Sequence, residues 1–381
     1  MGFETIKLKD LTTNLDNKRK PLNELERKSL KKKGLYPYCG ANGVLDYIDE
    51  FIFDQEILCI AEDGGNWGFR EKCAYIMNGP CWVNNHAHVL VAKENVNIKY
   101  LCYYLNYADL SKHITGTTRG KLTKSALEEI DVIVPDYSTQ YKIVNTLDKA
   151  QELIDKRKAQ IEALDQLTQS VFLEMFGDPV KNSLGFKTEP LHELCVHIFG
   201  GGTPSKSNPE YYVGNIPWVT PKDMRDIVIN DSIDHINEDA IANSSAKLIP
   251  PNSLLMVIRS GILKKKLPIA INTREVTVNQ DMKAFVIDKN KITVEYLLYF
   301  FEFYQKVLLN RVRSVTADNL DFQQIKEILV PVPPLNKQKE FGNIFYKVLE
   351  EKNKCLQQLN ELENNFNSLM QRAFKGELFN D

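Results

Sequence analysis

Clusters of Lys and Arg are the residues of this sequence whose types and spacing point most directly to chemistry. They are Lys31, Lys32 and Lys33; Arg259 with Lys264, Lys265 and Lys266; Arg119 with Lys121; and Arg311 with Arg313. Grouped cations of this kind bind phosphate groups, although a run of charges is more often a solvated surface. The pattern therefore predicts sites for a polyanion at several loops.

Polar and aromatic residues in glycine-rich or turn-like segments form a second set of candidates. Asn, Gln, Lys and Arg side chains can read the edges of nucleic-acid bases when loops present them to a groove. The candidates are Tyr38, Asn42, Asn66, Trp67, Asn85, His86, Thr203, Ser205, Lys206, Trp218, Lys222 and Gln280.

Patterns typical of an active site, a cofactor or a metal are incomplete in the chain. The glycine-rich turn at residues 63–68 has neither the dinucleotide-binding spacing nor the Lys-Ser/Thr of a phosphate-binding loop. Residues 208–211 approach the Asn-Pro-Pro-Tyr motif of adenine methyltransferases but lack its second Pro. His86 and His88 do not have the spacing of a zinc site, and we expect them to be structural or to contact bases. We predict a non-catalytic chain without a metal or cofactor of its own.

The length, hydrophobic content, net charge and cysteines of the chain restrict the class of protein. With 381 residues, 43% of them hydrophobic, the chain is long enough for two or three globular units. The net charge of -2 means that local basic clusters, not a global field, must attract any polyanion. The seven Cys form no Cys-x-x-Cys pair, and no stretch has the length and apolarity of a signal or membrane segment, so we expect a cytoplasmic protein with reduced thiols and no membrane contact.

The sequence is internally duplicated, and this repeat determines the expected architecture. Residues Ile130, Val132, Val134, Pro135 and Gln140 recur in the same order as Ile328, Val330, Val332, Pro333 and Gln338. Within each copy, short apolar runs predict strands, as at 56–60, 87–91, 253–258 and 283–287. Helices are predicted at 99–110 and 294–309. Each copy is therefore expected to contain an α+β globule. We also expect the basic groups to correspond between the copies: Lys264–Lys266 to Lys31–Lys33, and Arg311 with Arg313 to Arg119 with Lys121.

Each copy ends in a long segment with apolar residues at alternating spacings of three and four. Gly177 and Gly376 are expected to end these two segments as helices. A period of 3.5 residues over some five heptads predicts a coiled coil, and two ordinary core helices are the alternative. The residues expected to pair the helices are Ile154, Ile161, Leu164 and Val171, together with Leu359, Leu362, Phe366 and Leu369. Antiparallel pairing would relate the two globules by pseudo-two-fold symmetry, so each globule is expected to bind half of a bipartite, asymmetric ligand.

Several of these segments resemble the specificity (S) subunit of type I DNA restriction-modification systems, over essentially the full length of the chain. The segments that carry the resemblance are residues 36–43, 60–64, 84–90, 202–205, 214–223 and 369–378.

The resemblance implies a non-catalytic subunit that reads double-stranded DNA. It divides the chain into a first target recognition domain (1–137), a first spacer helix (138–178), a second target recognition domain (179–334), and a second spacer helix with a C-terminal tail (335–381). The helices would dock two methyltransferase subunits, which bind S-adenosylmethionine, and motor-nuclease restriction subunits would join them. Two alternatives are a coiled-coil protein-binding scaffold without DNA specificity, and an enzyme fused to such DNA-reading domains.

Overall fold

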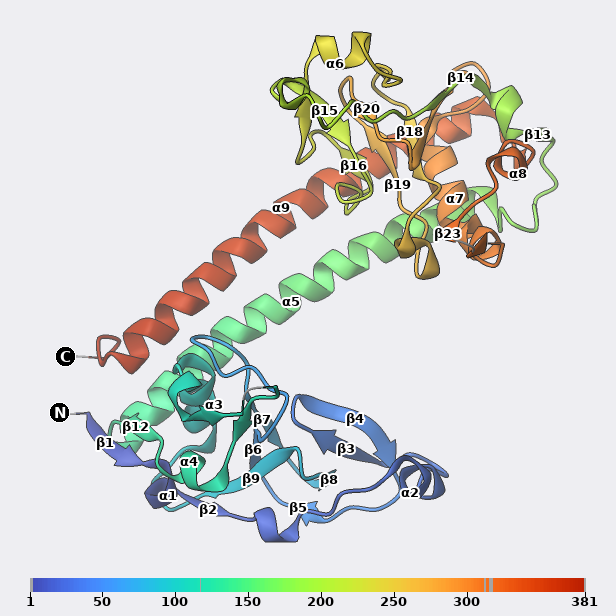
Figure 1. Ribbon diagram of the computed structural model, residues 1–381. Coiled ribbons are helices and arrows are strands. Elements are labelled where there is room, and N and C mark those ends of the chain that lie inside the picture. The colour runs from blue at the N-terminus through green and yellow to red at the C-terminus, as the bar shows by residue number, and fades with distance from the viewer. Residues whose placement is uncertain (1–2, 117, 312, 315–317, 380–381) are drawn as a thin grey trace. The chain divides into compact units, whose positions relative to one another are not determined.

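The computed structural model describes residues 3–116, 118–311, 313–314 and 318–379, without the side chains of residues 313 and 314. The chain divides into two compact units, one formed by Met1–Lys158 with Gln357–Asp381 and the other by Ala159–Leu356. The helices α5 (Tyr137–Phe176) and α9 (Leu335–Phe374) are each continuous (Figure 1). Each unit therefore consists of a globule, part of α5 and part of α9.

The first unit is built on two four-stranded sheets, whose strand orders are β2-β9-β6-β7 and β4-β3-β8-β5. The first sheet contains β2 (Thr12–Asn14), β9 (Ala87–Ala92), β6 (Ile57–Ala61) and β7 (Ala74–Met77); the second contains β4 (Gly43–Ile48), β3 (Tyr36–Gly40), β8 (Pro80–Val83) and β5 (Phe53–Asp54). The other elements are β1 (Glu4–Lys7), which pairs with β12 (Asp131–Val134), the hairpin β10 (Ile114–Thr115) and β11 (Lys121–Leu122), the helices α1 (Leu8–Leu11), α2 (Glu24–Ser29), α3 (Ile98–Tyr107) and α4 (Lys124–Glu128), and the 3-10 turns η1 (Asp16–Lys18) and η2 (Ser111–His113).

The second unit has a five-stranded sheet of order β14-β21-β18-β19-β16 and a three-stranded sheet of order β17-β15-β20. These strands are β14 (Cys195–Gly200), β21 (Met282–Ile287), β18 (Leu254–Val257), β19 (Ile269–Asn272), β16 (Val228–Ile229), β17 (His235–Ile236), β15 (Ile216–Val219) and β20 (Thr277–Val278). The other elements are β13 (Thr188–Pro190), which pairs with β24 (Leu329–Pro331), the hairpin β22 (Arg313–Ser314) and β23 (Asp318–Asn319), the helices α6 (Glu238–Ala242), α7 (Val294–Leu309) and α8 (Phe322–Lys326), and the turns η3 (Leu191–Leu194), η4 (Pro209–Tyr212) and η5 (Gly261–Lys264).

Strand pairing confirms that the two globules repeat one plan. β6 pairs antiparallel with β9, with Leu58 opposite Leu90, and β18 pairs in the same way with β21, with Leu254 opposite Phe285. The parallel pairs β3–β8 and β15–β20 also correspond. Because both the neighbours and the register agree, residues of one globule can be matched to residues of the other.

A buried glutamine connects each long helix to its globule. The Gln140 side chain accepts a hydrogen bond from the Asn97 amide at 2.9 Å and donates one to the Pro135 carbonyl at 2.9 Å. Gln338 makes the matching bonds to Thr293 at 2.9 Å and to Pro333 at 2.7 Å. These bonds satisfy buried polar groups at the start of α3 and α7, and thereby fix the direction in which each long helix leaves its globule.

The helix pairing is antiparallel within the second unit. There Asp165 of α5 binds Lys352 of α9 at 2.6 Å, and one heptad later in α5, Phe172 contacts Phe341, which lies earlier in α9. In the first unit, Lys158 binds Glu363 at 2.8 Å. The eight residues expected to pair the helices are all buried or half-buried, and Phe366 also packs on Tyr103 of α3.

The ends of both helices follow the sequence signals. Gly177 and Gly376 have positive φ angles of 68° and 75°, the left-handed conformation that glycine adopts at low cost just beyond a helix. The predicted α+β class is also confirmed, and the helix predicted at 294–309 has the observed bounds of α7.

Candidate nucleic-acid interface

In the first unit, four loops meet at the end of β6 and the start of β9. They contribute Asn42, Asp63, His86, Arg119 and Lys121, which we call the first loop cluster. The Asn42 side chain, in the β3–β4 turn, donates a hydrogen bond to the Gly64 carbonyl at 3.2 Å. Backbone pairing of Asp63 with Lys121 brings the β10–β11 hairpin to the same place.

Asp63 is the centre of the first loop cluster. One of its carboxylate oxygens lies 2.9 Å from Nδ1 of His86 and 2.6 Å from Nη2 of Arg119. The Arg119 side chain remains largely exposed. The carboxylate therefore holds two side chains in fixed directions, while both keep surface that a ligand can reach.

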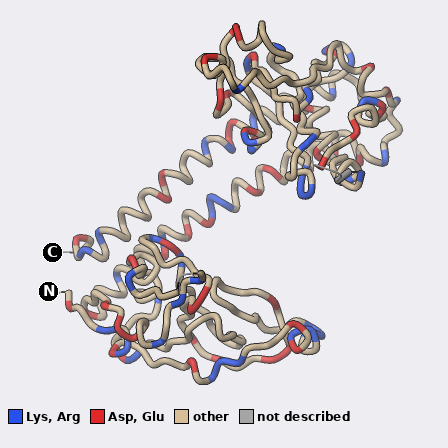
Figure 2. Tube along the Cα trace, in the orientation of Figure 1, with Lys and Arg blue, Asp and Glu red and all other residues tan. Residues whose placement is uncertain are grey.

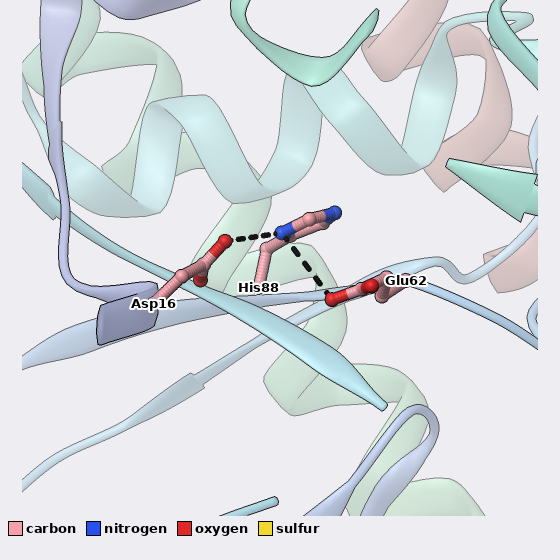
Figure 3. Close-up of side chains that lie close together, drawn as sticks. All are labelled: Asp16, Glu62 and His88. Carbon is pink, nitrogen blue, oxygen red and sulfur yellow. Dashed lines mark hydrogen bonds and ion pairs between the residues drawn. The ribbon is translucent and has the colours of Figure 1, made fainter. Parts of the chain in front are cut away.

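A group of ion pairs next to these loops includes Asp16 and Glu62, whose carboxylates both face the His88 ring (Figure 3). Glu62, next to Asp63, binds Arg19 at 2.6 Å and Lys121 at 3.0 Å. Asp16 binds His88 at 2.6 Å and Arg19 at 3.3 Å. Since these bonds join η1, β6, β9 and β11, the network ties the strand ends to the hairpin that carries Arg119.

The buried His88 ring is held by acceptors on both sides. Its Nδ1 faces the Asp16 carboxylate, and its Nε2 lies 2.8 Å from the Leu122 carbonyl oxygen. Both ring nitrogens therefore face oxygen atoms, which fixes the orientation of the ring.

By residue type and closeness, Asp16, Glu62 and His88 could also ligate a metal ion, because one atom of each lies within 4.8 Å of the others. Their carboxylates, however, already bind the cations Arg19 and Lys121. We therefore interpret the group as an ion-pair network.

The network shifts the acidity of both carboxyl groups. Burial by itself favours their neutral forms, but the hydrogen bond from His88 lowers the pKa of Asp16. In the same way, hydrogen bonds from Arg19 and Lys121 outweigh burial and lower the pKa of Glu62.

Replacing Asp16 by Asn is expected to lower the free energy of unfolding of the first unit by about 1–3 kcal/mol at neutral pH, because His88 and Arg19 lose a charged acceptor. The folded-state pKa of Asp16 lies below its unfolded value. The contribution is therefore fully present above the unfolded pKa and is lost as the pH falls through the folded pKa. Chemical unfolding of the wild type and Asp16→Asn from pH 7 downward should show the difference shrinking below about pH 4. A difference that is the same at pH 7 and pH 3 would show that the Asp16 charge is not responsible.

The corresponding strand ends of the second unit carry a different set of side chains. Thr203, Arg259, Lys264, Gln280 and Asp281 form what we call the second loop cluster. Arg259 follows β18, and its Nε lies 2.6 Å from the Asp281 carboxylate, which precedes β21. Thr203 donates a hydrogen bond to the Gln280 side chain, and Lys264 lies 3.7 Å from Asp318.

The two clusters have opposite polarity at matching positions. The amide of Glu62 bonds to the His86 carbonyl, as that of Ile258 bonds to the Asp281 carbonyl. Asp63 therefore corresponds to Arg259, and His86 corresponds to Asp281. In the first unit the acidic Asp63 comes before the basic His86, whereas in the second unit the basic Arg259 comes before the acidic Asp281. The same scaffold therefore presents different chemistry in each globule.

The Lys31–Lys33 segment is not brought to the first loop cluster. Lys31 forms an ion pair with Asp46, and the amides of Lys32 and Lys33 bind the Asp49 carboxylate at 2.7–3.0 Å. These acids lie toward the end of β4 that is far from the Asn42 turn. The side chains of Lys32 and Lys33 remain exposed.

Three aromatic candidates are core residues, and this corrects their expected exposure. Tyr38, Trp67 and Trp218 are buried. The Trp67 indole donates to the Ala61 carbonyl at 3.2 Å, and that of Trp218 donates to the Gly202 carbonyl at 3.0 Å. Each Trp thus packs beneath a glycine-containing loop and supports it instead of facing a ligand.

The basic groups of the two halves are not structural equivalents, which is a second correction. Lys31–Lys33 precede β3, whereas Lys264–Lys266 follow β18, the counterpart of β6. Likewise, Arg119 and Lys121 lie in the turn and second strand of their hairpin. Arg311 precedes the matching hairpin, and Arg313 begins it, with a side chain outside the part that the structure describes.

The remaining candidates are exposed or half-buried on separate loops. Asn66 and Asn85 lie beside the first loop cluster in sequence, Ser205 and Lys206 follow Thr203, Lys222 follows β15, and Lys265 and Lys266 follow Lys264. Lys222 and Asn42 occupy corresponding turns, since β15 corresponds to β3.

Sequence reasoning missed the acidic members of both clusters. Asp63 lies in the glycine-rich turn and in the segment 60–64 that carries the resemblance, but the sequence does not mark it as a site residue, and it does not mark Asp281. A usable signal was present for Asp281, because it follows Asn279-Gln280 as His86 follows Asn84-Asn85. Arg19 stands out in the sequence only as part of the basic stretch 18–33, and nothing local marks Asp16, whose partner His88 lies far along the chain.

Comparison with known proteins agrees with this duplicated arrangement. The family model described as the type I restriction modification DNA specificity domain matches residues 1–164 and again residues 184–364. The chain belongs to the type I restriction-modification DNA specificity family. Its two matched regions correspond to the two globules and the long helices that follow them.

Named relatives come from the same specificity family. The EcoR124I/EcoR124II specificity subunit of Escherichia coli is 31% identical over 258 residues, which cover 66% of this chain and 63% of that relative. That match spans less than two thirds of the relative's length. A protein of Haemophilus influenzae named as a type I specificity subunit is 25% identical over 363 residues, covering 89% of this chain and 86% of the relative.

Solved structures share the fold. The S subunit of a type I restriction-modification system from M. genitalium superposes with a TM-score of 0.63 at 16% identity, covering 98% of this chain and 96% of that chain. A chain from a study of complex assembly in the type I system gives a TM-score of 0.55 at 15% identity, covering 99% and 98%. In the described part of the chain, no helix is both long enough and apolar enough to span a bilayer.

Proposed function

We propose that this protein is the DNA sequence-specificity subunit of a type I restriction-modification complex. Each globule reads one half of a bipartite, asymmetric target in double-stranded DNA. The observation that carries the proposal is the repeat of one loop framework with opposite polarity at matching positions. Two globules that share one fold but carry different side chains at matching positions suit a target whose halves differ in sequence.

Membership of the specificity family supports the following proposal for the partners. The long helices dock two methyltransferase subunits, which bind S-adenosylmethionine and methylate adenine, and motor-nuclease subunits join the assembly in the cytoplasm. This chain contributes recognition and scaffolding and performs no catalysis. Acidic and basic residues are interspersed in both globules (Figure 2), so short basic clusters, not a uniformly positive face, would make the phosphate contacts.

Mapping of methylated adenines across the genome, with and without this gene, tests the proposal. Loss of one bipartite motif on deletion, and its return on complementation, is the expected result. An unchanged methylome in a strain whose methyltransferase is expressed and active would contradict the proposal. Co-purification of this chain with the methyltransferase, without a change in methylation, would instead support the alternative of a coiled-coil scaffold without DNA specificity.

Changing Lys31, Lys32 and Lys33 together to Ala is expected to weaken DNA binding by the assembled complex and to flatten its salt dependence. Each phosphate contact that is lost lowers the slope of log K against log salt by about 0.9. Because Lys31 is neutralised by Asp46, we expect a loss of no more than about two contacts. Binding isotherms at several salt concentrations measure this, and an unchanged slope would remove the segment from the interface.

A further inference from the structure

Arg259 has the surroundings of a side chain that is oriented for recognition. It lies directly after β18, at the position that corresponds to Asp63. Its side chain is 48% exposed, and its Nε is engaged by Asp281 at 2.6 Å. Within the described part of the chain, its terminal amino groups make no further hydrogen bond or ion pair, and the half-exposed side chain leaves them open to a ligand.

Asp281 is itself held in place, which fixes the direction of Arg259. The buried side chain of Asn279 donates to one Asp281 oxygen at 3.1 Å and accepts from the Asp281 amide at 3.1 Å. The Asn279 amide in turn bonds to the Val219 carbonyl at 3.0 Å. This chain of bonds anchors the guanidinium to the sheet and reduces the side-chain entropy that binding would otherwise cost.

A guanidinium anchored through Nε offers its two amino groups to a planar pair of acceptors. Guanine presents such a pair, O6 and N7, in the major groove, and Arg binds it in a bidentate manner. Phosphate is the competing ligand, but the neighbouring Lys264, Lys265 and Lys266 are exposed and suit that role. In the first unit the corresponding position is Asp63, which has no donor and cannot make the same contact.

We propose that Arg259, oriented by Asp281, reads a guanine in the half-site bound by the second globule. This inference rests on the proposed function and makes it specific. Arg259 makes the base contact, Asp281 is a positioning residue, and the first globule reads its half-site with a side-chain set of opposite polarity.

The test uses the full complex of this chain with its methyltransferase, in cells, with methylated adenines mapped for each variant. Arg259→Ala and Arg259→Lys are expected to make one guanine position of one half-site degenerate, with discrimination there falling about tenfold to a hundredfold. All other positions of the motif should keep their preference. Asp281→Asn should give a smaller loss at the same position, because Arg259 remains but its anchor is weaker.

Two controls separate this inference from its alternatives. Arg274→Ala, an exposed Arg on the β19–β20 connection of the same unit, should leave the motif unchanged. Asp63→Asn should alter preferences only in the other half-site. Methylation that weakens at all sites while the motif stays intact would make Arg259 a phosphate contact and overturn the proposal.

The failure of this inference can be told apart from failure of the proposed function. If the wild-type complex methylates a bipartite motif and Arg259→Ala methylates the same motif with the same preference, only the role of Arg259 is wrong. If deletion of the gene changes no motif, the proposed function fails first. Hydrogen exchange of the Arg259 variants should match the wild type in β18 and β21, which shows that the unit remains folded.

Discussion

Replacing Phe172 by Ala is expected to lower the free energy of unfolding of the second unit by about 3–5 kcal/mol, the usual cost of removing a buried aromatic ring. The ring is fully buried near the end of α5. It lies 5.0–5.8 Å from the rings of five aromatic residues, which come from α5, α7 and α9: Phe176, Tyr296, Tyr299, Phe303 and Phe341. A cavity at this point would remove contacts that join three helices.

Denaturant unfolding followed by hydrogen exchange of peptides from each unit measures the effect. Leu173→Ala is the matched control, since that neighbouring side chain is exposed and should change stability by less than about 0.5 kcal/mol. A loss below about 1 kcal/mol for Phe172→Ala would contradict the described packing.

Replacing Phe374 by Ala should destabilise the first unit by a similar amount, about 3–5 kcal/mol. Phe374 is the last residue of α9, and its buried ring lies 5.0–5.5 Å from Tyr100, Tyr104 and Tyr107 of α3. Residues from the end of the chain therefore complete a core whose strands come from its beginning.

The decisive readout for Phe374→Ala is faster exchange of amides in α3 and β6, with α7 and β18 protected as in the wild type. Phe379→Ala, at a half-exposed ring beyond the helix, is the control and should leave both units unchanged. Equal loss of protection in β6 and β18 would show that the two units do not unfold separately.

The parts of the fold that the sequence predicted are those determined by local pattern. The apolar period of the long helices, the Gly stops at 177 and 376, and the Pro-Gln repeat at their starts are each visible within a few residues. The apolar period of a helix shows which of its faces is buried, whatever element packs against that face. For this reason the two long helices could be predicted from the sequence.

The candidate site was predicted less completely, because its geometry depends on pairs distant in the chain. The sequence shows Lys31–Lys33 as a free basic run, whereas Asp46 and Asp49 fold against it from the next strand. The sequence places Trp67 in a loop, where an aromatic side chain could face a ligand. In the structure its indole is buried and donates a hydrogen bond to the Ala61 carbonyl. Charge runs and aromatic residues indicate composition, and only tertiary contacts decide which of them reach a ligand.

Because the ribosome synthesises the chain from its N-terminus, the two units cannot complete their folding at the same time. Residues Ala159–Leu356 form one uninterrupted stretch, while the other unit needs Met1–Lys158 and also Gln357–Asp381. On the ribosome, the later-starting unit is therefore complete first. The earlier one must wait with an open core until Met370, Ala373 and Phe374 emerge, since these residues belong to its hydrophobic cluster. A nascent chain interrupted just after Leu356, before the last part of α9, would thus leave the ribosome with one complete unit and one that exposes apolar surface to chaperones and proteases.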